Sequence, residues 1–255
     1  PLRKVISKLK LRASYGQVGN ANLGGRRFAY LSTITDDYDT LNMYKWGLDS
    51  SYGLTGMAEG EFAVQDLTWE IVNKMNLGVE LGFLNGMIDL QLDYFDERRK
   101  DIFMPRESVP MTAGFMKQPW KNFGKVTNQG VEVSLNVNKQ FGKDLFVSLM
   151  GTFTYAHNEI TEKDEPSAVV GTNRAETGHP VGQLTGYIAE GLFTEDDFED
   201  VSTGKLKEGI PTQSFVSKLR PGDIRYRDVN GDGKVDVFDK SPIGGTKDPE
   251  IVYGF

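Results

Sequence analysis

The residues WEIVNKMNLGVELGFLNGMIDLQLDYF, numbers 69–95, decide the fold. Between Trp69 and Phe83, seven of the eight odd-numbered positions are apolar, whereas most even-numbered positions are polar or glycine. Because successive side chains of a β-strand point to opposite faces, this alternation predicts a strand with one apolar and one polar face. Residues 84–87 contain an Asn-Gly pair, which favours a two-residue type I′ hairpin turn, and the alternation resumes at Ile88.

Other segments of the chain repeat this alternation. A soluble antiparallel sheet with one solvated face would show the same pattern, but its strands run about 5–6 residues. A membrane-crossing strand needs about 9–11 tilted residues, and the run at 69–83 is longer than that. Length therefore favours strands whose apolar faces meet outer-membrane lipid. Strands are expected near residues 8–16, 69–83, 88–95, 123–141, 145–157 and 251–255.

The connections between these runs alternate between short and long. The short ones are 84–87 and 142–144, and the long ones are 17–68, 96–122 and 158–250. All long connections then fall at one end of the sheet, as in outer-membrane barrels with short periplasmic turns and long outer loops. Five or six strands cannot close a barrel, since the smallest have eight. The sequence therefore predicts an all-β fold: an antiparallel up-and-down transmembrane β-barrel segment, about 5–6 strands of a larger barrel, with long extracellular loops.

Composition excludes several classes of protein. The chain has 255 residues, a net charge of −7 and no Cys, so thiol enzymes, disulfide scaffolds and zinc–thiolate sites are excluded. Its longest segment without a formal charge, Leu145–Asn158, is shorter than the ~18 residues expected of a transmembrane helix. There is no basic stripe, so no nucleic-acid partner is expected. The chain does not begin with Met, which indicates a piece of a longer protein.

A series of short motifs runs along most of the chain. In their order they resemble the late barrel of the SusC/RagA-type TonB-dependent outer-membrane receptors. The motifs are Leu67-Thr68-Trp69-Glu70, Leu84-Asn85-Gly86, Leu92-Asp93-Tyr94-Phe95, Asn128-Gln129-Gly130-Val131-Glu132, Pro180-Val181-Gly182, Gly186-Tyr187, Glu190-Gly191-Leu192-Phe193, Arg220–Gly233, Ile243-Gly244 and Pro249.

This resemblance implies a nutrient importer in the outer membrane of a Gram-negative bacterium. Such a receptor is a large plugged barrel of the 22-stranded sort. It would take its energy from TonB and be capped by a SusD-like surface lipoprotein that helps to capture oligosaccharides, or sometimes peptides. The chain departs from the full pattern because it has no plug domain, no TonB box and no final strands. On this resemblance, 1–255 is a partial barrel domain that contributes wall, outer loops and part of the partner surface.

An acidic segment near the C-terminus has the spacing of a calcium-binding loop. Its oxygen-bearing residues fall at positions 1, 3, 5, 7, 9 and 12 of an EF-hand loop, with Gly233 at position 6 for the sharp bend. Ca²⁺ binds six to eight oxygens, so the sequence predicts a calcium site that stiffens an outer loop. The alternative is an Asp/Asn/Gly-rich surface turn without a metal. The predicted ligands are Asp228, Asn230, Asp232, Lys234 through its carbonyl, Asp236 and Asp239.

Aromatic residues in the long connections are candidates for contact with a ligand or partner. Their ring faces can stack on sugars, although packing within the loops would use the same residues, and Tyr and Trp also form girdles at membrane interfaces. The candidates are Tyr44, Trp46, Phe115 and Trp120.

Catalytic motifs are absent from the sequence. It has no G-x-S-x-G elbow, and the only two histidines, His157 and His179, do not form an H-E-x-x-H motif, so no enzymatic activity is expected. Two alternatives to an importer stay open. One is a soluble, surface-displayed β-domain that binds glycans and has a calcium-stabilised loop. The other is a glycan-cleaving enzyme, since an acidic chain always offers pairs of carboxylates.

Overall fold

The computed structural model describes residues 5–35, 44–48, 52–54 and 57–255. The chain divides into two compact units. The first comprises Pro1–Ser167 and Ile251–Phe255, and the second comprises Ala168–Glu250. One large sheet dominates the first unit, whereas the second is made of short strand pairs.

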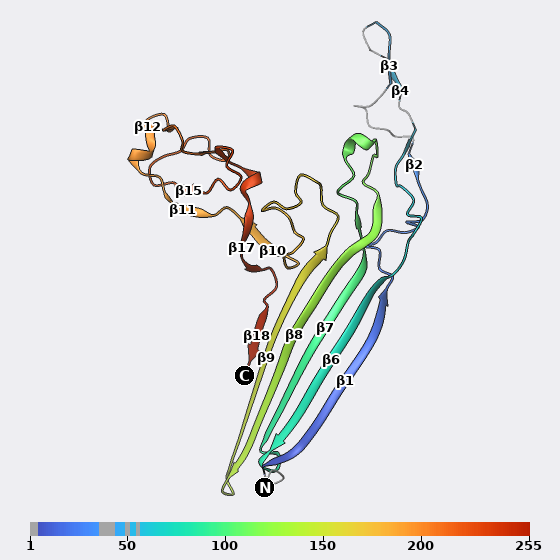
Figure 1. Ribbon diagram of the computed structural model, residues 1–255, viewed down its shortest axis with the longest axis vertical. Helices are drawn as coiled ribbons and strands as arrows, with labels where there is room; N and C mark the ends of the chain where they lie inside the picture. The colour runs from blue at the N-terminus through green and yellow to red at the C-terminus, as the bar shows by residue number, and fades with distance from the viewer. Residues whose placement is uncertain (1–4, 36–43, 49–51, 55–56) are drawn as a thin grey trace. The chain divides into compact units, whose positions relative to one another are not determined.

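Six antiparallel strands form the sheet of the first unit, in the order β1-β6-β7-β8-β9-β18 (Figure 1). Each pairs with the strand that precedes it in this order, so the sheet is up-and-down, as the alternation predicts. The all-β, antiparallel prediction is confirmed. The strands are β1 (Ile6–Asn20), β6 (Glu70–Phe83), β7 (Ile88–Pro105), β8 (Trp120–Phe141), β9 (Leu145–Glu162) and β18 (Ile251–Gly254).

The strand register collects side chains of one kind into rows that cross the sheet. Side chains of adjacent rows point to opposite faces, so one face is apolar and the other polar. Over the first five strands, a polar row contains Arg12, Gly78, Asp93, Glu132 and Thr154. The apolar row beside it contains Leu11, Val79, Leu92, Val133, Phe153 and Tyr253.

The apolar face of this sheet is not a buried core. Leu77 is 47% exposed and Leu149 is 58% exposed, and Leu90 and Val133 are only half-buried. In a soluble β-sandwich, the same positions would be covered by a second sheet. Contiguous exposed apolar surface of this kind marks a contact with another apolar surface or with a membrane.

The predicted outer loop 96–122 is wrong at both ends. Strand β7 continues to Pro105, and β8 begins at Trp120. The alternation breaks in this region because charged residues replace apolar ones, but the charges pair across strands and the ladder continues. Lys74 of β6, for example, lies 2.7 Å from the carboxylate of Glu97 on β7. Cross-strand pairs of opposite charge stabilise a sheet that the hydrophobic pattern no longer marks.

The predicted outer loop 17–68 also begins too early, because β1 extends to Asn20. Its described part contains two short antiparallel pairs. Strand β2 (Ile34–Thr35) pairs with β5 (Ala58–Glu59), and β3 (Tyr44–Trp46) pairs with β4 (Tyr52–Leu54).

The turn between β6 and β7 is centred on Asn85 and Gly86, as predicted. The register closes at Phe83 and Ile88, which leaves four residues in the turn. Leu84, Asn85 and Gly86 have φ values of 54°, 57° and 85° and form a 3₁₀ turn, η3 (Leu84–Gly86). Asn and Gly tolerate this left-handed backbone, and the N–H of Met87 donates to the carbonyl of Leu84, so the Asn-Gly pair forms the centre of the predicted connection 84–87.

The predicted outer loop 158–250 is wrong as a simple connection, because β9 runs to Glu162 and residues 168–250 fold into the second unit. Phe193, Phe198 and Leu219 are buried together at its core. No alternating run marks this unit, because its strands are two to six residues long. It contains the pairs β10 (Gln183–Gly186) with β17 (Ser241–Thr246), β11 (Ala189–Leu192) with β15 (Ile224–Tyr226), β12 (Phe198–Asp200) with β13 (Lys205–Leu206) and β14 (Thr212–Gln213) with β16 (Lys234–Val235), and the 3₁₀ turns η5 (Glu195–Asp197) and η6 (Val237–Asp239).

Within the described residues, helical structure is limited to short 3₁₀ turns such as η4 (Met111–Ala113). In the part of the chain that the structure describes, no helix has the length and apolar character needed to cross a membrane.

Candidate functional site

A partly buried ion pair crosses the polar face of the sheet. The Arg12 guanidinium on β1 donates to both carboxylate oxygens of Asp93 on β7, at 2.8 and 2.7 Å. These strands are not neighbours, and Gly78 of β6 lies between them. A Cβ at Gly78 would lie 2.4 Å from Oδ1 of Asp93, so a side chain at this position would displace the carboxylate.

Further charges extend this network along the same face. The carboxylate of Glu80 lies 2.8 Å from Nζ of Lys8 and 3.2 Å from Nζ of Lys10. Nε of Arg12 lies 3.3 Å from the same carboxylate. A face that carries this many charges needs water or a polar partner against it, as the interior of a large barrel provides.

Asp164 anchors the connection between β7 and β8. Its carboxylate accepts hydrogen bonds from the Ser108 hydroxyl at 2.8 Å, from the Ser108 N–H at 3.1 Å and from Nε of Arg106 at 3.0 Å. Burial raises the pKa of Asp164, but the hydrogen bonds from Ser108 and Arg106 outweigh it, so the pKa lies below its usual value. Asp164 therefore ties residues 106–119 to the chain that follows β9.

Two of the candidate aromatic residues lie near this connection. The Arg26 guanidinium lies 4.2 Å from the centroid of the Trp120 ring, and the Phe103 ring lies 5.1 Å from it. Phe115 meets Phe62 edge-on at 5.3 Å but stays partly exposed. Trp120 therefore packs within the loops, whereas part of the Phe115 side chain is exposed and accessible to a ligand.

The other two aromatic candidates, Tyr44 and Trp46, lie on β3. Their backbones pair with those of Leu54 and Tyr52. Their side chains lie outside the described part of the structure, so their role stays a prediction.

A pocket of about 340 Å³ lies beside Trp120. Glu61 lines it, forms an ion pair with Arg26 and accepts a hydrogen bond from Nζ of Lys117 at 2.8 Å. The hydrogen bond from Lys117 lowers the pKa of Glu61, and Arg26 adds to this effect. Aromatic rings beside a fixed pair of charges can hold a sugar ring or an apolar side chain together with its polar neighbours. The lining includes Arg26, Arg27, Phe28, Phe62, Phe103 and Trp120.

The predicted calcium loop of the second unit is held by its own hydrogen bonds. Asp239 is fully buried, and its carboxylate accepts from the N–H groups of Val229 at 2.8 Å and Asp236 at 2.7 Å. The two carboxylate oxygens of Asp228 accept from the N–H groups of Gly231 and Gly233, each at 2.7 Å. These bonds bend the segment into a tight loop.

The remaining predicted ligands lie on the same loop. Asn230 accepts from the N–H of Asp232, and Asp232 accepts from the N–H of Lys234. The hydrogen bond from the N–H of Phe238 lowers the pKa of Asp236, and Lys234 acts in the same direction. Among the described residues, no three His, Cys, Asp or Glu side chains are gathered as a metal centre. Calcium binding stays a prediction.

Comparison with known proteins decides the family. The family described as TonB dependent receptor-like, beta-barrel, matches residues 2–241. The chain belongs to this family.

The TonB-dependent receptor SusC of Bacteroides thetaiotaomicron is 29% identical over 239 residues, which cover 92% of this chain and 22% of SusC. TonB-dependent receptor P3 of Formosa agariphila is 24% identical over 263 residues, which cover 98% of this chain and 24% of P3. The chain thus spans about a quarter of the length of these relatives.

Solved structures show the same fold. The RagAB peptide importer in its closed-closed state matches 97% of this TonB-dependent receptor chain and 24% of its own chain, with a TM-score of 0.62 and 20% identity. A second RagAB structure, described as a peptide transporter, matches 98% of this chain and 25% of its own, with a TM-score of 0.62 and 21% identity. The predicted β-barrel segment and the resemblance to SusC/RagA-type receptors are therefore confirmed.

The same comparisons decide between the alternatives left by the sequence. TonB-dependent receptors are transporters and not enzymes, as the missing catalytic motifs predict. Neither the glycan-cleaving enzyme nor the soluble β-domain gains support from the family or from the exposed apolar face of the sheet.

Sequence reasoning missed the residues that fix the geometry of this receptor segment. Arg12 and Asp93 are 81 positions apart and meet only because of the strand register, and Asp164 and Ser108 are 56 apart. One signal was available, because a glycine inside a strand often marks a close approach. Gly78 lies within the longest alternating run and marks the ion pair that crosses it.

Proposed function

We propose that this chain forms barrel wall and outer loops of a SusC-like, TonB-dependent importer in the outer membrane of a Gram-negative bacterium. The importer takes up oligosaccharides or other large nutrients together with a SusD-like lipoprotein. TonB energises it through a plug region outside this chain. The observation that supports the proposal best is the six-stranded sheet, with exposed apolar rows on one face and an ion-pair network on the other. Lipid would contact the first face, and the lumen would lie against the second.

The class of nutrient is the finer part of this proposal. The RagAB structures are those of a peptide importer, which favours a peptide as cargo. The pocket beside Trp120 combines aromatic rings with the Arg26–Glu61 ion pair, which suits a sugar ring equally well. We propose that Phe115 and Trp120 of the β7–β8 connection, together with Tyr44 and Trp46 of the β1–β6 connection, contribute to ligand or partner contact.

Growth on a single nutrient tests the importer. The gene is deleted in its own host, and growth is measured on a panel of polysaccharides and on a protein digest as the only carbon source. The deletion strain is expected to lose growth on one of these and to recover it with the wild-type gene. A SusD-like lipoprotein should purify with the tagged receptor from outer membranes. Normal growth on every nutrient, or a receptor found outside the outer membrane, would contradict the proposal.

We also propose that the loop 228–239 binds Ca²⁺. The spacing of its oxygens supports this, and so does the closed loop that Asp228 and Asp239 already form. Calcium added to the EDTA-treated full-length receptor is expected to protect residues 228–239 from hydrogen exchange. Asp232→Asn should weaken this effect, whereas Asp196→Asn on the neighbouring 3₁₀ turn should not. Exchange that is unchanged at millimolar calcium would exclude the site.

A further inference from the structure

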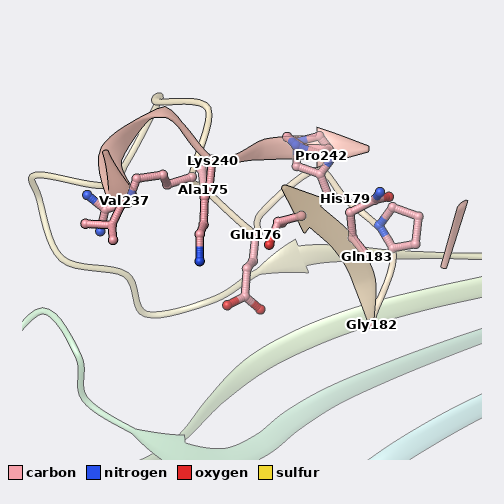
Figure 2. A pocket seen from close by; sticks show the side chains of 11 residues that line it. Ala175, Glu176, His179, Gly182, Gln183, Val237, Lys240 and Pro242 are labelled. Carbon is pink, nitrogen blue, oxygen red and sulfur yellow. The ribbon is translucent and has the colours of Figure 1, made fainter. Parts of the chain in front are cut away.

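A second pocket, of about 350 Å³, lies within the second unit (Figure 2). It lies between the segment 174–185 and the residues around Lys240, which directly precedes β17. Its volume is at the lower end of the range of small-molecule sites, about 300–1,000 Å³. The lining includes Arg174, Glu176, His179, Gln183, Val237 and Lys240.

Hydrogen bonds hold the two walls of this pocket together. The side-chain amide of Asn173 donates to the carbonyls of Phe238 and Lys240, at 3.0 and 2.7 Å. On the other side, the N–H of Lys247 donates to the carbonyl of Gly182 at 2.9 Å, where β10 and β17 pair. The pocket is therefore formed before any ligand arrives, which lowers the entropic cost of binding.

Aromatic faces orient the two cationic side chains of the pocket. The Arg174 guanidinium carbon lies 4.8 Å from the centroid of the Phe238 ring, and Nζ of Lys240 lies 5.7 Å from that of Tyr187. A guanidinium stacked on a ring keeps its N–H donors in its own plane, where a carboxylate can take two of them. Stacking thus positions Arg174 for a planar anion.

The charge of the pocket lining also favours an anion. Arg174 and Lys240 together carry two positive charges, against the single carboxylate of Glu176. The lining therefore has one net positive charge, and Asp236, outside the lining, is close enough to Arg174 to interact with it electrostatically. In Figure 2 the side chains of Lys240 and Glu176 extend the same way, so the carboxylate reduces the positive charge there without removing it.

We propose that this pocket binds the carboxylate of a small polar ligand, with Arg174 and Lys240 as its anchors. Such a carboxylate belongs either to an acidic sugar or to the C-terminus of a short peptide. His179 and Gln183 line the same space and offer polar atoms for the rest of the ligand. The inference concerns binding alone and does not depend on the proposed import.

Titration of the purified full-length receptor tests this site. Glucuronate and glycylglycine are the acidic probes, and glucose and glycinamide are their controls without a carboxylate. Isothermal titration should show saturable binding of at least one acidic probe and none of its control. If only glucuronate binds, the source is an acidic sugar, and if only the dipeptide binds, it is a peptide terminus. No saturable binding of either acid, or equal binding of the controls, would overturn the proposal.

Substitutions in the pocket should change the affinity for the acidic probe in opposite directions. Arg174→Gln and Lys240→Gln should each weaken binding about tenfold, because each removes a charge-assisted hydrogen bond. Glu176→Gln should strengthen binding, which a folding defect would not do. Lys207→Gln removes an exposed lysine of the same unit outside the pocket and should have no effect. Equal affinities of the four variants and the wild type would exclude this pocket as the site.

Discussion

At Gly78, the absence of a side chain lets an ion pair cross a strand. The Arg12 guanidinium reaches Asp93 over the backbone of β6, at 2.7 Å from the nearer oxygen. Asp93 is 8% exposed, and a buried carboxylate that loses its partner is strongly destabilising. The ion pair therefore also depends on Gly78, although this residue contributes no atom to it.

Gly78→Ala should displace the ion pair, because its Cβ would lie 2.4 Å from Asp93 and 3.0 Å from Nε of Arg12. We expect a loss of about 1–3 kcal/mol in the free energy of unfolding. Urea titration of the full-length receptor in detergent measures it. Gly16→Ala on β1 is the matched control, since a Cβ there meets nothing within 4 Å. Equal stability of the two variants would show that the pair does not depend on Gly78.

Asp239→Ala should loosen the loop 228–239. Its carboxylate accepts from the N–H groups of Val229, Asn230 and Asp236, and a donor that is left unpaired away from water costs about 1–3 kcal/mol. Hydrogen exchange of these amides should become faster in the variant. Asp196→Asn, an exposed change on η5, should leave it unchanged. Unaltered exchange in Asp239→Ala would show that other contacts hold this loop.

At the scale of the elements, the hydrophobic alternation predicted the central strands because lipid and lumen impose a period of two on a long run. The strand ends were missed where charged pairs such as Lys74–Glu97 replace that pattern. The second unit was missed because its core of Phe193, Phe198 and Leu219 comes from short strands and turns. The ion pair was not predicted because its residues meet through the strand register, and the Asp164 anchor was not predicted because it joins segments beyond the ends of β7 and β9.

Asp164 is one of the anchors of the connection 106–119, in addition to the contacts of Phe115 with Phe62 and of Lys117 with Glu61. Asp164→Ala should expose this connection to protease, because Ser108 and Arg106 lose their common acceptor. Limited proteolysis of the detergent-solubilised receptor should show faster cleavage within 106–119. The variant Asp144→Asn, in the exposed β8–β9 turn, should be cleaved at the same rate as the wild type. Resistance of Asp164→Ala to cleavage would contradict the anchoring role.

The same anchor should respond to acid. The pKa of Asp164 is lower in the folded chain than its usual value of about 3.9, so its stabilising effect is complete above that value. The effect is lost as the pH falls through the folded pKa, because the carboxylate becomes protonated. Cleavage by pepsin within 106–119 should therefore increase at acid pH in the wild type. In Asp164→Asn the pH dependence should be smaller, and an identical pH profile would contradict this assignment.

For the molecule as a whole, the central claim is that lipid covers the apolar rows of the six-stranded sheet. Four single-cysteine variants test it, made in a full-length receptor from which any Cys outside residues 1–255 has been removed, since 1–255 contain none. Leu92→Cys and Val133→Cys lie on one apolar row, and Gln91→Cys and Ser134→Cys lie on an adjacent polar row. Each is spin-labelled in the full-length receptor in bilayers, and the collision rates of the label with oxygen and with a water-soluble nickel chelate are compared. Labels at Leu92 and Val133 should collide mainly with oxygen, which concentrates in lipid, whereas labels at Gln91 and Ser134 should not. Labels at Leu92 and Val133 that collide mainly with the nickel chelate, or with neither reagent, would contradict the account.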